Sequence, residues 1–349
     1  MLKTNISKLY RMPAEWEKQK STLIGWPYNK ADWPGRFDKI PNVFAKIISN
    51  LSVSQRVNIL VKNSNSKKKI KVFLSKYEIN LKNIYFIICK TDRVWMRDTG
   101  PIFVKNKKNK NLLCNWKFNG WAKYKNHKYD DKVNFKIKKF YRSKVVLPKF
   151  NKRRIILEGG SIDVNGRGLL LTTRECLLSK IQQRNFNLKR RDYNKIFEKF
   201  LGVNQVIWLN KGIYGDDTHG HVDDIARFVN KNKIFIAHEK NKRDKNYKNL
   251  NENIKILRNI KKKIKSLKIK KIPMPKPIYI KKIRVPATYL NFYISNKFVL
   301  LPTYNDPNDK IVINIFKKQF RDRKIIPIDC SDLIWGFGAI HCLTQQEPR

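Results

Sequence analysis

Apolar and polar positions along this chain recur in one pattern: an apolar run, a short polar turn rich in Asn, Lys or Gly, and a second apolar run. Such a pattern predicts a β-hairpin. It occurs in four stretches, PIFVKNKKNKNLLCNW, GGSIDVNGRGLLLTT, DIARFVNKNKIFIAH and NFYISNKFVLLPTY. The residues that precede the four turns are separated by 60, 65 and 65 positions: Val104, Val164, Val229 and Ile294. A near-constant interval predicts repeated supersecondary units.

The segments between the predicted hairpins supply a helix and a buried strand to each unit. Apolar residues at helical spacing predict helices at 42–51, 193–201 and 312–321. Short apolar runs predict buried strands at VNIL, VIWL and IIPI. The repeated order of hairpin, helix and strand predicts a mixed α/β fold.

The length of the chain leaves room for one more unit than the hairpins show. About five units of this size fit into 349 residues, whereas four hairpins are visible. We therefore expect a fifth unit that combines both ends of the chain, around STLIGWPYN and the final GAIHCL, so that the tail is the closing strand of a ring. Residues 1–349 are expected to form a single domain.

The formal net charge of +50, from 77 Lys and Arg against 27 Asp and Glu, has two interpretations. One is a polyanionic partner such as nucleic acid or a membrane, and the other is lysine in solvated positions. Lysines are scattered along the chain and no nucleic-acid-binding motif is recognisable, so we expect solvated lysines and no specific nucleic-acid partner. The one dense basic block, 240–271, has apolar residues at helical spacing and predicts an amphipathic surface helix: Ile254, Leu257, Ile260, Ile264 and Leu267.

The cysteines form no CxxC pair and no zinc-binding spacing. Their odd number and the lack of an N-terminal signal segment indicate a reducing cytoplasm. No apolar run reaches the roughly 20 residues that span a bilayer, and we expect no membrane association. The five are Cys89, Cys114, Cys176, Cys330 and Cys342.

Polar residues with chemical potential gather at corresponding edges of the units. Asp98 in WMRDTGP precedes the first hairpin, Glu158 in LEGGSI leads the second, and Cys342 lies in the closing segment. The third hairpin is led by GDDTHGHVDDIARF, which we expect to run as a strand at the edge of the core, with Asp216, Asp217, His219, His221, Asp223 and Asp224. A near-symmetric ring would bring these edges together around its axis.

Each of these residues also has an ordinary structural explanation. Asp98 can pair with Arg97 or cap a turn, and a lone His221 or Cys342 is more often part of a core. The acidic block is harder to explain in this way, because unpaired buried carboxylates are very costly and need a partner. A cationic ligand would satisfy several of them at once.

Together the residues describe a reaction. Cysteine, histidine and a carboxylate form the constellation for nucleophilic catalysis. Additional carboxylates match the forked donors of a guanidinium group best. A metal site is the rival explanation for the His and Asp cluster, but Cys342 is distant in sequence and no triad of water-activating ligands stands out. We expect neither a metal nor a cofactor.

At these motifs the chain resembles the agmatine deiminase family, which is grouped with bacterial-type peptidylarginine deiminases in the guanidine-modifying pentein superfamily. The resemblance runs nearly end to end, through MPAEWE, GWPYNKADWPG, WMRDTGP, FNGW, LEGGSIDVNGRGLLLTTRECLL, GDDTHGHVDDIARF, YLNFYISN, DPND and IHCLTQQ. It implies one catalytic domain folded as a five-bladed, pseudo-symmetric α/β propeller. It also implies hydrolytic deimination of agmatine to N-carbamoylputrescine and ammonia through a Cys amidino-thioether, in putrescine biosynthesis.

Two alternatives to that function stay open. The guanidine substrate could be arginine or peptidyl-arginine, or the chain could be a basic nucleic-acid-binding protein on an inactive scaffold. The resemblance also implies a homo-oligomer, a dimer or larger.

Carried over by position, the resemblance implies a role for each principal residue. The nucleophile falls on Cys342 and the general acid/base on His221, with Glu158 as the carboxylate partner of the histidine. The guanidinium clamp falls on Asp98 and Asp223, and Trp95 and Asp217 are implied substrate-pocket residues.

The sequence departs from the family pattern in three places. His219, an expected loop or pocket-rim residue, replaces the usual aspartate. Ala122-Lys123-Tyr124 replaces a glycine-rich segment, which bears on the local loop geometry. Phe337 and Ala339 interrupt the glycine run before the nucleophile, so we expect a narrower pocket.

Overall fold

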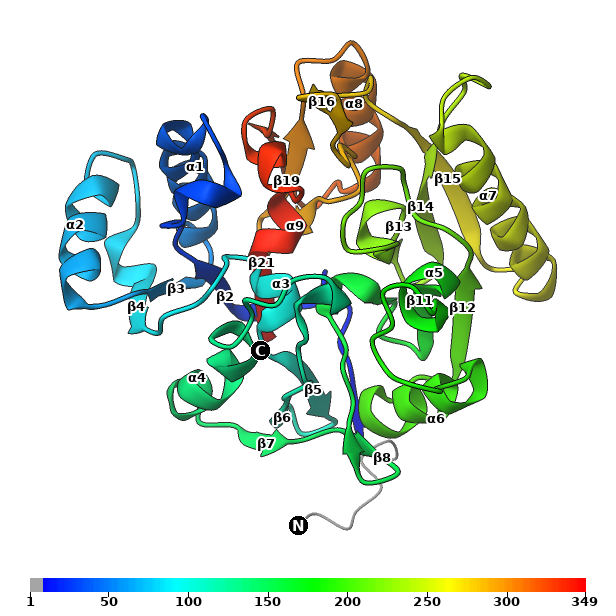
Figure 1. The fold of residues 1–349 in the computed structure, drawn as a ribbon, viewed down its shortest axis with the longest axis horizontal. Coiled ribbons are helices and arrows are strands. Elements are labelled where there is room, and N and C mark those ends of the chain that lie inside the picture. The colour runs from blue at the N-terminus through cyan, green and yellow to red at the C-terminus, as the bar shows by residue number, and fades with distance from the viewer. Residues whose placement is uncertain (1–8) are drawn as a thin grey trace.

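The computed structural model describes residues 9–349 as an α/β protein. All four predicted hairpins are present, and each is an antiparallel pair of strands (Figure 1). They are β5 (Ile102–Asn106) with β6 (Asn111–Cys114), β10 (Asp163–Val164) with β11 (Leu169–Thr173), β13 (Ala226–Asn230) with β14 (Lys233–His238), and β18 (Tyr293–Ile294) with β19 (Phe298–Thr303).

A further strand pairs in parallel with the second strand of each hairpin. These strands are β7 (Lys144–Val146), β12 (Gln205–Leu209), β15 (Lys268–Pro273) and β20 (Lys324–Asp329). Two of them, β12 and β20, contain the predicted runs VIWL and IIPI. Parallel pairing requires a crossover connection, and a helix provides it in each unit. The helices are α4 (Val133–Tyr141), α6 (Arg190–Leu201), α7 (Asn246–Lys263) and α8 (Asn308–Gln319).

The fifth unit combines both ends of the chain, as expected. β2 (Gln19–Gly25) pairs antiparallel with the C-terminal β21 (Thr344–Pro348) and parallel with β3 (Arg56–Val61). β4 (Ile84–Ile88) completes this sheet, and α1 (Ile40–Ser52) and α2 (Ser64–Leu74) provide its crossovers. GAIHCL itself leads through the short α9 (Ile340–Leu343) into the closing strand, which is the polar but buried TQQEP.

Five sheets of three or four strands, together with two short hairpins, account for the strands of residues 9–349, and no sheet closes on itself. In Figure 1 the sheets and their helices surround a centre where β21, α9 and α3 (Met96–Thr99) lie. The α/β class is therefore confirmed, and a closed five-bladed propeller stays a prediction. No helix within residues 9–349 is long and apolar enough to cross a membrane.

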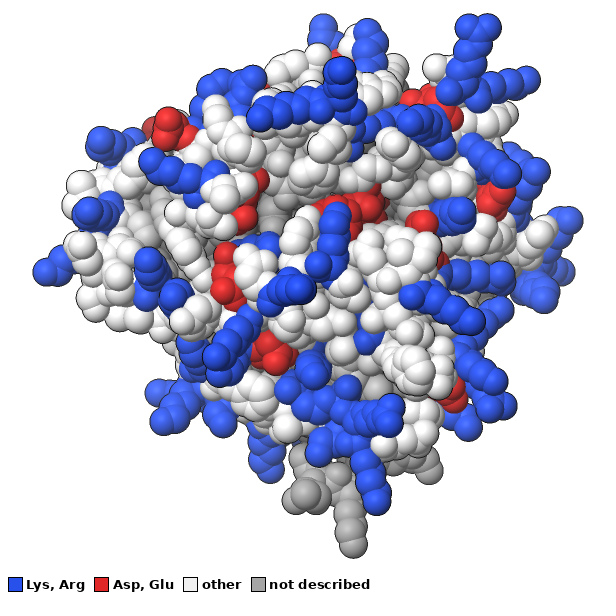
Figure 2. Space-filling model, viewed as in Figure 1, with Lys and Arg blue, Asp and Glu red and all other residues white. Residues whose placement is uncertain are grey.

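The surface helix predicted from the basic block is only partly correct. α7 ends at Lys263, and Ile254 and Leu257 are buried on its inner face. Ile264 leaves the helical conformation, and Leu267 is buried in the loop before β15. The apolar spacing therefore continued past the helix because the following loop also packs on the core. Figure 2 shows Lys and Arg scattered over the visible face and along its rim, with acidic side chains nearer its centre.

Candidate active site

A cavity of about 450 Å³ lies where several distant segments meet. Trp95, Asp98, Asp217 and Cys342 all line this space, which we call the Cys342 cavity. The hairpin of β16 (Tyr279–Ile280) and β17 (Ile283–Arg284) borders it as well. Four of the seven residues singled out from the sequence thus line one cavity. Asp223, His221 and Glu158 are fully buried behind it.

Cys342 is held in the short helix α9 by the side chain of Asn291. The backbone N–H groups of His341 and Cys342 donate to Asn291 Oδ1 at 3.0 and 3.2 Å. Asn291 Nδ2 in turn lies 3.1 Å from Cys342 Sγ. Burial and the nearby carboxylates raise the pKa of the thiol well above its usual value, while the amide opposes this shift. The resting cysteine is therefore a thiol that needs a positive charge to ionise.

Gly338 lies where the backbone comes close to Trp95 and Cys342. A Cβ at this position would lie 2.6 Å from the ring of Trp95 and 3.1 Å from Cys342 Cβ. Only glycine permits this close approach of the backbone to the two side chains. The tryptophan ring is consequently packed directly against the nucleophile segment.

Asp98 presents its carboxylate to the cavity from α3. Trp121 Nε1 donates to Oδ2 at 2.9 Å, and the backbone N–H of Gly160 donates to Oδ1 at 3.0 Å. Burial raises the pKa of Asp98 to about 6, and the carboxylates of Asp223 and Glu158 add to the shift. The group is ionised near neutral pH and lacks a cationic hydrogen-bond donor of its own among the described residues. A bound guanidinium would supply one.

Asp223 lies in a short 3-10 turn over Val222–Asp224. His341 Nδ1 contacts its Oδ2 at 2.6 Å, and Asn291 Nδ2 lies 3.4 Å from the same atom. Burial opposes ionisation, yet the hydrogen bond and charge of His341 leave the pKa of Asp223 lowered. Its Oδ1 has no hydrogen-bond partner within residues 9–349. Asp223 therefore has one unpaired carboxylate oxygen, although its side chain does not line the Cys342 cavity.

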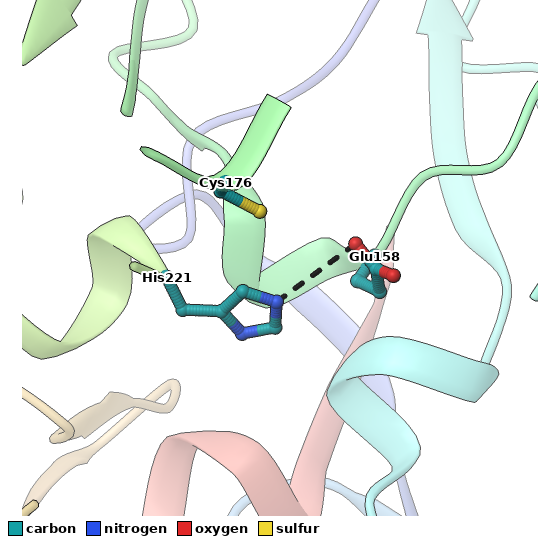
Figure 3. A group of neighbouring side chains, drawn as sticks. All are labelled: Glu158, Cys176 and His221. Carbon is teal, nitrogen blue, oxygen red and sulfur yellow. Dashed lines mark ion pairs between the residues drawn. The ribbon is translucent and has the colours of Figure 1, made fainter. Parts of the chain in front are cut away.

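His221 stands between two carboxylates. Its Nε2 lies 3.8 Å from Glu158 Oε2 (Figure 3). Its Nδ1 lies 3.9 Å from Asp98 Oδ1. Although burial alone would lower the pKa of the imidazole, these charges raise it well above the usual value. Neither ring nitrogen has a hydrogen-bond partner in the described part of the chain. The ring is therefore an acid at rest, with Nδ1 on the side of Asp98.

Arg184 is a site residue that the sequence did not reveal. Its Nε lies 3.1 Å from Glu158 Oε1, and both side chains are completely buried. Burial of Glu158 opposes ionisation, but the charge of Arg184 lowers the pKa of this carboxyl to about 2. Glu158 is consequently an anion throughout the working pH range. Arg184 comes from a polar loop with no recognisable pattern, so no signal marked it.

Asn291 was also missed, although it belongs to the NFY segment of the fourth hairpin. Glu15 of MPAEWE is a third such residue, since its Oε2 lies 2.8 Å from Nε2 of His341. His341 thus connects this N-terminal carboxylate to Asp223. Asn291 and Glu15 each lie in a recognisable motif, but their partners are distant along the chain and could not be read from it.

The predicted strand over DDTHGHVDD is wrong. His219 has φ +68° and Gly220 has φ +89°, which is a left-handed turn. Asp216 Oδ2 accepts the backbone N–H groups of Gly220 and His221 and fixes this turn. His219 is a loop residue whose Nε2 contacts Ser179 Oγ at 2.9 Å, and it does not line the Cys342 cavity. The turn separates the two imidazoles and directs only His221 inward.

Non-glycine residues near the two altered glycine-rich segments adopt positive φ. Trp121, Ala122 and Phe337 adopt φ of 57°, 55° and 66°, a conformation in which L-residues lose about 1 kcal/mol or more each. Phe337 also lines the Cys342 cavity. These positions keep the backbone that glycine would favour, and the phenylalanine side chain occupies part of the cavity wall.

The outer part of the cavity carries both signs of charge. Asp217 accepts from Tyr124 Oη at 2.6 Å, and burial raises its pKa. Burial also raises the pKa of Asp32, a further lining residue, to about 6. Arg93 and Lys281 face the same space. The pocket is therefore not purely acidic, contrary to the impression that Asp98 and Asp217 alone convey.

Comparison with known proteins gives consistent relatives. Residues 11–348 match the family of Porphyromonas-type peptidyl-arginine deiminases. An agmatine deiminase of Ectopseudomonas mendocina is 28% identical over 363 residues, which cover 97% of this chain and 95% of that protein. The agmatine deiminase structure from Enterococcus faecalis has a TM-score of 0.90 at 27% identity and covers 100% of this chain and 99% of that one. A substrate-bound agmatine deiminase from C. jejuni has a TM-score of 0.86 at 29% identity, with coverage of 98% and 97%.

Proposed function

The chain belongs to the Porphyromonas-type peptidyl-arginine deiminase family and has the α/β pentein fold, and from this we propose that it hydrolyses agmatine to N-carbamoylputrescine and ammonia. This reaction is a step toward putrescine. The observation that carries the proposal is that Asp98 and Cys342 line the same cavity, with His221 Nδ1 3.9 Å from the Asp98 carboxylate. A carboxylate, a thiol and an imidazole in this order suit attack on a guanidinium carbon.

Substrate binding uses the two clamp carboxylates. Asp98 is ionised near neutral pH, and Asp223 has one oxygen without a partner in the described chain. Paired charge-assisted hydrogen bonds from the guanidinium would satisfy both and place its central carbon at Cys342 Sγ. The bound cation lowers the pKa of the adjacent thiol, which releases its proton to solvent and becomes the thiolate when substrate binds.

The first half-reaction forms a C–S bond and breaks a C–N bond. The thiolate adds to the guanidinium carbon, and His221 donates a proton to the departing nitrogen, which leaves as ammonia. Cys342 then carries the amidino group as a thioether. Asn291 Nδ2, at 3.1 Å from Sγ, stabilises the thiolate before attack.

The second half-reaction restores the cysteine. His221 has given up its proton and accepts one from a water molecule, whose oxygen adds to the amidino carbon. The C–S bond breaks, Cys342 leaves as a thiolate, and the added hydroxyl loses its proton to solvent. The carbon then carries the oxygen, one amino group and the alkyl-bearing nitrogen of the substrate, which together are the ureido product. Glu158, held ionised by Arg184, stabilises the imidazolium form of His221 in both steps. No cofactor takes part in this scheme.

An arginine-type substrate that carries a carboxylate is the second candidate. Two observations favour it: Arg93 and Lys281 line the cavity, and the matching family is named for peptidyl-arginine deiminases. Both terminal nitrogens of Arg93 already donate to Asn126, at 2.7 and 2.8 Å, which reduces what it offers to a ligand. Asp217 and Asp32 favour the free amine of agmatine instead.

Membership of this family also bears on the closure of the propeller, the cell compartment and the oligomeric state. We infer that the five sheets are the blades of a closed pseudo-symmetric propeller, since each repeats one strand order and the termini share a sheet. The five free, buried thiols suit a reducing cytoplasm. We also propose a homo-oligomer with no specific nucleic-acid partner.

Product analysis tests the function. Purified protein incubated with agmatine should release N-carbamoylputrescine and ammonia in equal amounts. The values of kcat/KM for agmatine, arginine and an arginyl peptide then rank the substrates. A clear preference for the peptide or for arginine would overturn the assignment to agmatine.

A further inference from the structure

A second thiol lies at the active site and has no part in the proposed reaction. Cys176 is in α5 (Arg174–Leu178), where its backbone N–H donates to the capping Thr173 Oγ1 at 3.0 Å. Its side chain is completely buried. One donor atom each from Glu158, Cys176 and His221 lie within 4.8 Å of one another (Figure 3). The Cys176 thiol and the Glu158 carboxylate therefore both lie next to the imidazole of His221.

The donor atoms of this group are unsatisfied despite their burial. Glu158 Oε2 and both nitrogens of His221 have no hydrogen-bond partner within residues 9–349, although the two residues are 0% and 1% exposed. Buried polar atoms without a partner are uncommon and call for an explanation. Arg184 contacts only the other oxygen of Glu158 and leaves Oε2 free.

The three atoms form a donor set of a particular kind. A carboxylate oxygen, an imidazole nitrogen and a thiolate sulfur are the usual ligands of Zn²⁺. With metal–ligand bonds of about 2.0 to 2.3 Å, tetrahedral ligands lie about 3.5 Å apart. A separation of at most 4.8 Å thus requires the donors to close by about 1 Å, within the reach of side-chain adjustment.

We propose that Glu158, Cys176 and His221 form a binding site for a thiophilic divalent cation of the Zn²⁺ class, and that occupation of this site inhibits the enzyme. Binding releases the thiol proton and leaves the imidazole with at most one proton, so the cation replaces protons in the buried group. The inhibitory effect rests on the proposed deiminase function, whereas the binding does not.

Inhibition follows from which nitrogen the cation takes. Nε2 is the nitrogen that faces Glu158 Oε2, and Nδ1 faces Asp98. An imidazole with a metal ion on Nε2 cannot become an imidazolium, so it cannot protonate the leaving nitrogen. None of the three ligands lines the Cys342 cavity, so the cation and the substrate bind at different places. Zn²⁺ should lower kcat and leave KM for agmatine unchanged.

Cobalt spectroscopy in the absence of the nucleophile tests the binding itself. Cys342→Ser removes the thiol in the cavity, and metal-free protein is titrated with Co²⁺ to look for a thiolate-to-cobalt charge-transfer band. We expect one equivalent of Co²⁺ to produce the band. It should vanish in Cys342→Ser/Cys176→Ala and persist in Cys342→Ser/Cys114→Ala, which removes another completely buried thiol.

Two results would overturn the site. One is a band that appears only in proteins with Cys342, and the other is inhibition by Zn²⁺ that agmatine competes away. If the Cys176→Ala variant does not fold, X-ray absorption spectroscopy of Zn²⁺-loaded Cys342→Ser tests the site instead. We expect one sulfur and one imidazole among the Zn²⁺ ligands, and the absence of either would contradict the proposal. A protein that binds Co²⁺ as expected but never releases ammonia would leave the site standing and remove the proposed function instead.

Discussion

Asn291 Nδ2 lies 3.1 Å from Cys342 Sγ, and the Oδ1 of the same side chain accepts the backbone N–H of Cys342 at 3.2 Å. The Asn291 amide therefore holds Cys342 through its backbone N–H and also places an N–H donor next to its sulfur. Burial and three carboxylates oppose ionisation of the thiol, so this donor acts against a large unfavourable field.

Replacement of this amide should impair the nucleophile. We expect Asn291→Ala to lower kcat/KM for agmatine by about 10- to 100-fold, equivalent to about 1.4 to 2.7 kcal/mol in barrier. The pH profile of inactivation by iodoacetamide should move to higher pH, because the thiolate loses a donor. Asn305→Ala, at an exposed position, is the control. An unchanged alkylation profile in Asn291→Ala would show that the contact only supports packing.

The two histidines of DDTHGHVDD should differ sharply. His221→Ala loses both proton transfers and should reduce kcat by several orders of magnitude. His219→Asp restores the residue of the family pattern at a loop position away from the cavity, and aspartate tolerates its positive φ. Its activity should stay within about tenfold, or about 1.4 kcal/mol. Steady-state kinetics of both variants test this prediction. A larger loss of kcat in His219→Asp than in His221→Ala would show that His219 is the base.

The acid limb of the pH profile should report Asp98. Its pKa, raised to about 6 by burial, means that the carboxylate is ionised above this pH and neutral below it. Because only the anion binds guanidinium well, kcat/KM for agmatine should fall as pH decreases through about 6. Asp32 lines the same cavity with a pKa of about 6. The limb should persist in Asp32→Asn, and its disappearance there would assign it to Asp32.

The buried pair of Arg184 and Glu158 should matter for stability as well as for catalysis. Removal of one member of a buried pair costs about 3 to 5 kcal/mol, since it leaves an uncompensated charge. Arg184→Leu should therefore lower the free energy of unfolding in urea by about 3 kcal/mol or more, and addition of Glu158→Gln should recover part of this loss. Arg191→Leu removes an exposed partner of Asp192 and should change stability by less than about 1 kcal/mol. Equal effects of the two arginine variants would refute the role of burial.

The sequence was most informative about the fold where a pattern repeated. The four hairpins each have an apolar–turn–apolar signature, and their interval pointed to a fifth unit that the pairing of β2 with β21 confirms. Periodicity fails where the chain leaves a regular element but still packs on the core, as at Ile264 and Leu267 beyond α7.

The site was predictable only for residues with distinctive chemistry. Cys342, Asp98, Trp95 and Asp217 meet at one cavity, but the turn at His219 and Gly220 depends on positive φ that alternating polar residues did not reveal. Arg184 and Asn291 act through partners 26 and 51 residues away. A single polar residue in a sequence does not indicate which distant residue it will contact in the fold.

The most direct test of the central claim is release of ammonia from agmatine by the wild-type protein and by Cys342→Ala under identical conditions, with the covalent state of Cys342 followed by mass spectrometry of acid-quenched samples. We predict sustained release by the wild type with an amidino group on the Cys342 peptide, and neither release nor adduct in the variant. Agmatine turnover that survives in Cys342→Ala, or pure wild-type protein that never releases ammonia, would contradict the account.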